Sequence, residues 1–307
     1  MGLRKILCPV DFSPSSREAM TVALRLATQH RSELIISFVW RTAPTAASGE
    51  RLGPDEIVHD LVEQARWGLG ELAETMCKLG TSNVTPRIVD DQPWSKIVEL
   101  ANEDPEIDLV VFGTRDRTGL ARLLRGSIVE LVVRHAPCPV LVVPDEAVQP
   151  FARALCAVDL SPQSELEVEL AVEVMQAPAQ ITLLHVIESP SFYGEAFVPV
   201  GLDPSFATPA EDALDRWRAT LPIPTVSELR VGRADAEILM AAESRTFDLV
   251  VVATHSRDGL RRMFLGSVAE AVVRHSHRPV LVARPQRRTT RLPAVRERVL
   301  AEASMLP

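Results

Sequence analysis

The chain of 307 residues is 46% hydrophobic and 24% charged, which is typical of a water-soluble protein long enough to form two domains. No apolar run approaches the roughly 18 residues needed to cross a bilayer, so the sequence predicts no membrane protein. The net charge of −8 and the aromatic content of 5% argue against a dedicated nucleic-acid binder, which needs a basic surface and rings that stack on bases.

Short apolar runs alternate with longer helical patterns along the first half, which is typical of βαβ units and a parallel sheet. The first residues lack a signal-peptide segment, so we expect a cytoplasmic protein. Ser13-Pro14, like Ser161-Pro162 in the second half, predicts a helix start, because the serine hydroxyl can cap the helix and the missing N–H of proline costs nothing at the first position. The predicted strands are 5–10, 34–39, 84–89, 108–113 and 139–143, and the predicted helices run from Ser13, over 59–79, over 94–102 and from Ser127.

The second half repeats this order. The stretch ILCPVDFSPSS at 6–16 matches ALCAVDLSPQS at 154–164, and GTRDRTGLARLLRGS at 113–127 matches ATHSRDGLRRMFLGS at 253–267. Duplication is the simplest account. Runs such as 109–112 and 249–252 are continuously apolar, as expected of strands covered by helices on both faces. We therefore predict an α/β protein of two homologous, doubly wound, five-stranded parallel-sheet domains, at residues 1–146 and 151–285, with a basic C-terminal tail at 286–307.

Candidate binding residues follow the ends of the predicted strands. In an open parallel sheet, ligands bind at the carboxyl ends of the strands, where the strand order reverses. Asp11 and Asp159 close the first strand of each half, and their carboxylates could accept from a base amine or a ribose hydroxyl. The loop after the fourth strand ends in Gly126-Ser127 and in Gly266-Ser267, each at a predicted helix start. Free N–H groups and the helix dipole make such a start a phosphate site.

With these motifs, both halves resemble the universal stress protein family in its tandem form. Nucleotide-binding members of that family carry G-x-x-G, nine residues and then G-[ST] after the fourth strand. The first half has Asp116 at the second glycine, and the second half has Ala253 and Ser256 at the two earlier glycines. The resemblance implies a Rossmann-like, adenine nucleotide alpha-hydrolase-like fold. It also implies a stress-response regulator or sensor that binds ATP, ADP or AMP at one site at most.

We favour the second half for this site, because Ser256 is small and neutral whereas the Asp116 carboxylate would repel phosphate. No metal is expected other than magnesium that accompanies a nucleotide. In the second half the resemblance implies binding by Ala157, Val158, Asp159, Val186, Val252, Ala253, His255, Ser256, Gly266, Ser267 and Val268. In the first half it implies Pro9, Val10, Asp11, Val39, Phe112, Gly113, Arg115, Gly126, Ser127 and Ile128.

An architectural interpretation of the same residues stays open. Ser127-x-x-Glu130 and Ser267-x-x-Glu270 fit capping boxes, which satisfy helix starts without a ligand. Asp11 and Asp159 could simply hydrogen-bond the turns that follow, through Ser13 and Ser161. The alternative function is then an interaction protein that binds no nucleotide and acts through domain pairing and dimerisation. The resemblance implies that the halves pair through 139–143 and 279–283 as an intramolecular pseudo-dimer, and we expect a homodimer, with no nucleic-acid or membrane partner.

Other motifs predict no chemistry. The chain has no P-loop, no convincing nucleophile and base pair and no carboxylate dyad, so we predict no enzyme, although weak ATP hydrolysis stays open. Gly68-x-Gly70-x-x-Ala73 lies inside a helical pattern and is interpreted as chance. The histidines at 255, 275 and 277 predict no metal site, and His135 and His275 are interpreted as helix-end residues that stabilise the helix dipole. Cys8, Cys77, Cys138 and Cys156 form no motif and are predicted to be buried thiols.

Overall fold

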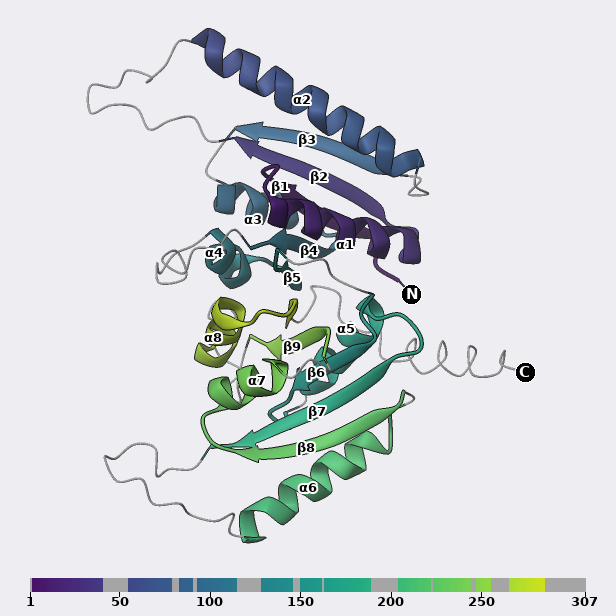
Figure 1. The fold of residues 1–307 in the computed structure, drawn as a ribbon, viewed down its shortest axis with the longest axis vertical. Coiled ribbons are helices and arrows are strands. Elements are labelled where there is room, and N and C mark those ends of the chain that lie inside the picture. The colour runs from purple at the N-terminus through teal and green to yellow at the C-terminus, as the bar shows by residue number, and fades with distance from the viewer. Residues whose placement is uncertain are drawn as a thin grey trace, which may run out of the picture. The chain divides into compact units, whose positions relative to one another are not determined.

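A computed structural model describes residues 2–40, 55–78, 83–90, 93–114, 128–145, 150–161, 163–188, 204–221, 223–243, 247–254 and 265–284 (Figure 1). The chain divides into two units between Ala147 and Val148. Among the described helices, none combines the length and the hydrophobicity of a membrane span.

The first unit is a parallel sheet in the order β3-β2-β1-β4-β5. Its central strands are buried because helices cover both faces. The helices α1 and α2 pack on β1 to β4, while α3 and α4 contact each other on the opposite face. The elements are β1 (Lys5–Val10), α1 (Pro14–His30), β2 (Glu33–Trp40), α2 (Asp55–Lys78), β3 (Val84–Asp90), α3 (Pro93–Glu103), β4 (Ile107–Gly113), α4 (Ile128–His135) and β5 (Val140–Val143).

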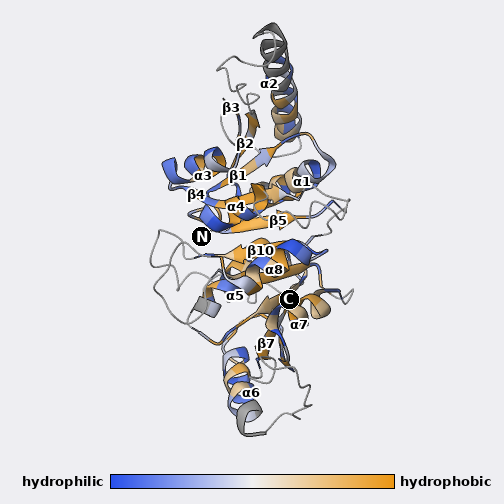
Figure 2. Ribbon diagram, turned by 90° about the vertical axis from the view of Figure 1, so that its left-hand side faces the viewer, coloured by the Kyte–Doolittle hydropathy of each residue, from blue (hydrophilic) through white to orange (hydrophobic). Residues whose placement is uncertain are grey.

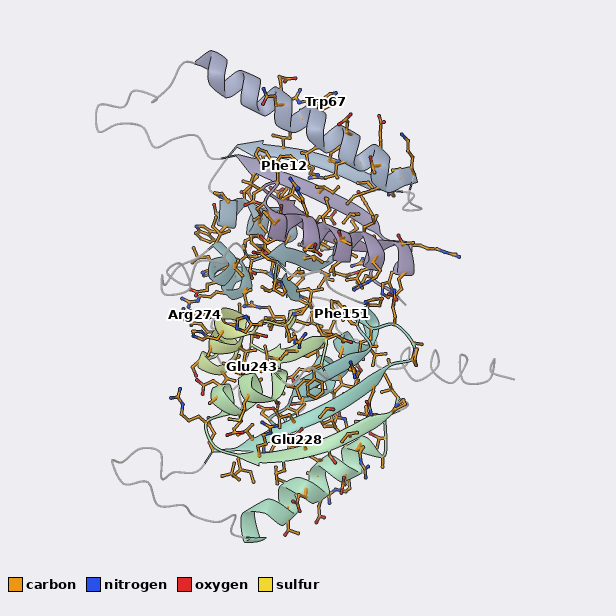
Figure 3. The ribbon with its side chains drawn as sticks, viewed as in Figure 1. Phe12, Trp67, Phe151, Glu228, Glu243 and Arg274 are labelled. Carbon is orange, nitrogen blue, oxygen red and sulfur yellow. The ribbon has the colours of Figure 1, made fainter. Side chains whose placement is uncertain are left out.

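The second unit repeats this topology, with a parallel sheet in the order β10-β9-β6-β7-β8. The fully buried Phe151, labelled in Figure 3, precedes its first strand. The last strand of each unit is coloured hydrophobic along its length in Figure 2. The elements are β6 (Arg153–Ala157), α5 (Gln163–Val174), β7 (Gln180–Ile187), α6 (Pro204–Arg218), β8 (Thr225–Val231), α7 (Ala234–Glu243), β9 (Leu249–Ala253), α8 (Ser267–His275) and β10 (Val280–Ala283).

The predicted fold class and the predicted strands are confirmed. Gly68 and Gly70 lie inside α2, as predicted. The prediction of four buried thiols is wrong for Cys77, which is exposed near the end of α2, whereas Cys8, Cys138 and Cys156 are buried. In an amphipathic helix, a shift of one position along the sequence can turn a side chain from the sheet to the solvent. The presence of a cysteine therefore does not by itself predict burial. The basic tail at 286–307 lies outside the described residues, and so do residues 146–149 between the two predicted domains.

Candidate functional site

The strand order of each sheet reverses beside its first strand. In the first half β1 lies between β2 and β4, and in the second half β6 lies between β7 and β9. The carboxyl ends of these strands carry the predicted site residues. The second half places there Ala157, Val158, Asp159, Val186, Val252, Ala253, Gly266, Ser267 and Val268, and the first half places Pro9, Val10, Asp11, Val39, Phe112, Gly113 and Ile128. His255, Ser256, Arg115, Asp116, Gly126 and Ser127 lie outside the described residues.

The aspartate after the first strand holds its turn in both halves. The backbone N–H of Ser13 donates to Oδ1 of Asp11 at 3.0 Å, and that of Ser161 donates to Oδ1 of Asp159 at 2.9 Å. The predicted architectural role of both carboxylates is therefore confirmed. Between aspartate and serine, each half places one residue in the left-handed region, which L side chains adopt at a cost. These residues are Phe12 and Leu160, each with a φ of 61°.

The two turns differ in how they start the following helix. In the first half, Oγ of Ser13 accepts from the N–H of Ser16 at 3.3 Å and caps α1, as predicted. The equivalent prediction for the Ser161 hydroxyl is wrong, because its Oγ is buried without a hydrogen-bond partner among the described residues. The N–H of Ser164 donates instead to the carbonyl of Ser161 at 3.0 Å.

In the second half, the hydroxyl of Ser164 hydrogen-bonds to the aspartate after the first strand. Its Oγ donates to Oδ1 of Asp159 at 3.0 Å and accepts from the backbone N–H of Asp159 at 3.2 Å. One ring nitrogen of His185, Nδ1, lies 2.8 Å from the carbonyl oxygen of Val158, immediately before Asp159. The carboxyl end of β6 is thus connected both to α5 and to β7. This connection presents the Asp159 carboxylate in a defined orientation.

The backbone at the start of α1 lies directly against Gly113, the last residue of β4. A Cβ atom added at Gly113 would collide with the backbone carbonyl of Ser15 and approach the N of Ser16 within 2.8 Å. Gly113 therefore permits a close backbone approach. The second half has Ala253 at this position, and Ala253 is not among the residues with positive φ. Alanine at this position of the second half therefore carries no cost from a positive φ.

The start of α8 overturns the predicted capping box. Its N-cap is Gly266, with φ −62° and ψ 150°, and Ser267 is already the first helical residue. The backbone N–H of Glu270 donates to the carbonyl of Gly266 at 2.9 Å, and its carboxylate accepts from Arg274 at 2.9 Å. The N–H of Gly266 is held by the Thr254 carbonyl at 3.0 Å. That contact places the helix start one residue earlier than the Ser-x-x-Glu pattern predicts.

The helix start in the second half therefore has no side chain at its cap. The amides of Ser267, Val268 and Ala269 precede the first intrahelical bond, which Glu270 makes. Ser267 is exposed, Val268 is half-buried and Ala269 is buried, so the turn is accessible at its first residue. Partial positive charge at this end of α8 favours an anion.

Two of the histidines end helices, as the sequence predicts. His135 is the last residue of α4 and His275 the last of α8. The His135 ring lies 5.5 Å from that of Trp94. Within the described ranges, no three His, Cys, Asp or Glu side chains gather in a way that could hold a metal ion.

Sequence reasoning missed Glu167. Its side chain is 2% exposed inside the second half, and burial together with the Asp159 charge raises its pKa well above the usual range. Burial, and then the Glu167 charge, raises the pKa of the Cys156 thiol as well. At the offset of 148 residues between the repeats, Glu167 aligns with Ala19 of the first half. This replacement of an alanine by a carboxyl residue is the sequence signal that could have identified Glu167.

Comparisons with known proteins agree on one family. The sequence model of the universal stress protein family matches residues 2–144 and again residues 150–284. A universal stress protein of Mycobacterium tuberculosis is 30% identical over 300 residues, which cover 91% of this chain and 94% of that protein. Another from the same species is 34% identical over 210 residues, which cover 66% and 69%. The crystal structure of a universal stress protein from Archaeoglobus fulgidus has a TM-score of 0.68 at 19% identity, covering 92% of this chain and 99% of that one.

Proposed function

Since the chain belongs to the universal stress protein family, with one family domain in each half, we propose that it binds an adenine nucleotide in its second half and acts as a stress-response regulator or sensor, without an enzymatic role. One observation carries this proposal. The uncapped start of α8 at Gly266 and the oriented carboxylate of Asp159 lie at the ends of β9 and β6, the two strands between which the order reverses.

The two groups suit opposite ends of a nucleotide. The amides at the start of α8 would bind phosphate oxygens, and the helix dipole would add favourable electrostatics. The Asp159 carboxylate would accept from a base amine or a ribose hydroxyl. Magnesium would enter only with the nucleotide phosphates. In the first half Asp116 would oppose phosphate, so we propose no site there.

Substitution of Gly266 tests the phosphate role. Gly266→Asp places a carboxylate at the helix start, and Gly266→Asn places a neutral side chain of nearly the same shape there. Both residues are good N-caps, and the extended backbone at Gly266 suits them. An added Cβ would lie 3.3 Å from the Thr254 carbonyl oxygen, so a small adjustment accommodates either. The charge is the main difference between them.

We expect Gly266→Asp to weaken ATP binding at least about fivefold more than Gly266→Asn, because a like charge at short range costs roughly 1 kcal/mol or more in a partly buried site. Isothermal titration calorimetry on the full chain measures both affinities, and circular dichroism checks that both variants are folded. Equal losses in the two variants would contradict the phosphate role. Wild-type protein that shows no rise in melting temperature with millimolar ATP would contradict nucleotide binding altogether and favour the interaction-protein alternative.

We also propose that the two halves pair through β5 and β10 as a pseudo-dimer. Each is an apolar strand with one neighbour, β4 or β9, in the sheet of its own half. An apolar strand at a sheet edge leaves backbone groups available and promotes aggregation unless something covers it. A homodimer of whole chains would follow from other surfaces. An experimental structure in which both last strands face solvent would refute the pairing.

A further inference from the structure

The second half buries a carboxyl group just inside the start of α5. Glu167 is 2% exposed, and its Oε2 atom has no hydrogen-bond partner within the described residues. Ser164, three residues earlier and therefore on the same helix face, is 0% exposed. A buried carboxylate without a partner is costly, so such a group takes up a proton unless a cation neutralises it.

The first half provides an internal comparison. At the offset of 148 residues, Cys156 corresponds to Cys8 and Glu167 corresponds to Ala19. Cys8, Cys156 and Ala19 are all 0% exposed. Both halves thus bury the residues at these two equivalent positions. At the second position, the second half has the carboxyl group of Glu167 where the first half has the methyl group of Ala19.

The groups that face Glu167 do not supply a neutralising charge. Asp159 raises the pKa of Glu167, and Cys156 from β6 is the other titratable neighbour. The helix α5 also packs on β9 and β10, whose residues are all uncharged. Arg284, just after β10, is buried and does not figure among the charges that act on Glu167. Along α5 itself the other acidic residues are Glu165, Glu169 and Glu173.

We propose that the Glu167 carboxyl is a positioning residue of the second-half site whose proton controls the Asp159 turn. Neutral Glu167 is compatible with the packed start of α5. Ionised Glu167 needs water, which it reaches only when the start of α5 moves away from β6. That movement displaces Ser164 and breaks its two hydrogen bonds with Asp159. As far as it concerns a ligand, this inference rests on the proposed function.

The direction of the pH effect follows from the raised pKa of Glu167. The closed state keeps its proton to a higher pH than the open state, whose Glu167 titrates in the ordinary range. Opening is therefore coupled to the release of one proton. Between the two pKa values, the open fraction rises by about tenfold per pH unit, and above the higher pKa it levels off.

The two buried thiols measure this opening without any nucleotide. The full chain is treated with 4,4′-dithiodipyridine at pH 5 to 8, and mass spectrometry of peptides gives the labelling rates of Cys156 and Cys8. Their ratio cancels the pH dependence of intrinsic thiol reactivity, which both share, and the Glu167 variants below account for the direct effect of the Glu167 charge on Cys156. We expect the Cys156 to Cys8 ratio to increase by about tenfold per pH unit over part of this range.

Variants connect the increase to Glu167. Glu167→Gln removes the titration, and Glu167→Ala reproduces the first-half residue, so the ratio should be independent of pH in both. The alanine variant decides the matter if the glutamine variant does not fold. Glu165→Gln, on the exposed side of the same helix, should keep the wild-type increase. A flat ratio in the wild type, or an equal increase in the Glu167 variants, would overturn the proposal.

A second measurement separates this inference from the proposed function. ATP affinity of the wild type should fall with rising pH once the open form is a substantial fraction of the protein, because affinity follows the closed fraction, and affinity of Glu167→Ala should not fall in this way. If no ATP binds at any pH, the proposed function fails while the thiol ratio still decides the role of Glu167. If ATP binds with a pH dependence that Glu167→Ala retains, the ligand part of the inference is wrong.

Discussion

Gly113→Ala is expected to destabilise the first half, because the added methyl group has no room. Its carbon would meet the carbonyl of Ser15 and the backbone N of Ser16, which cannot rotate away as a side chain would. The start of α1 must therefore shift. Ser16 donates its N–H to the cap at Ser13, and its hydroxyl donates to the Ser13 carbonyl at 3.0 Å, so the shift also strains the cap.

The magnitude follows from these two effects. Overpacking by one methyl group costs roughly 1–3 kcal/mol, and a weakened N-cap adds up to about 1 kcal/mol. For a domain of this size, each kcal/mol lowers the melting temperature by roughly 2–4 °C. We therefore expect the transition of the first half to fall by roughly 2–16 °C.

Tryptophan fluorescence assigns the transition. Three of the four tryptophans lie in the first half, so a Trp217→Phe background makes thermal fluorescence report on that half. Gly70→Ala is the matched control, since no atom lies within 4 Å of its added carbon and the position is inside α2. It should raise stability by roughly 0.5–1 kcal/mol. A Gly113→Ala melting temperature at or above that of the background protein would refute the steric argument.

Two further comparisons each pair a residue of the second half with a residue of the first. Ser267→Ala should change the free energy of unfolding by less than about 0.5 kcal/mol because Gly266 is the cap, whereas Ser13→Ala should cost about 1 kcal/mol, both measured by urea denaturation. Asp108→Asn should cost about 2 kcal/mol, because the buried carboxylate accepts from the backbone N–H and from Nε and a terminal nitrogen of Arg4. Asp248→Asn should cost less in the same assay, since Asp248 accepts from the backbone N–H groups of Ala152 and Arg153, and the reverse order would show that the guanidinium contributes little.

Much of the fold could be predicted because its signals are local or repeated. Continuously apolar runs such as 109–112 predict buried parallel strands, and Ser13-Pro14 predicts a helix start from adjacent residues. The duplication doubles each signal, because the second half repeats the element order of the first. The predicted edge of the sheet also follows from topology alone, since the carboxyl ends of parallel strands meet there.

Contacts between distant residues decided the details of the site. The sequence by itself determined that a Gly-Ser pair starts the last helix, but the hydrogen bond from Gly266 to Thr254 made the glycine the cap. Likewise, Gly113 is required by the approach of Ser15, which lies far away in the sequence. The charge of Glu167 predicts an exposed residue, yet the packing of α5 on β6 and β9 buries it beside Asp159. Local patterns determine which elements form, whereas the burial and the partners of each side chain depend on how those elements pack.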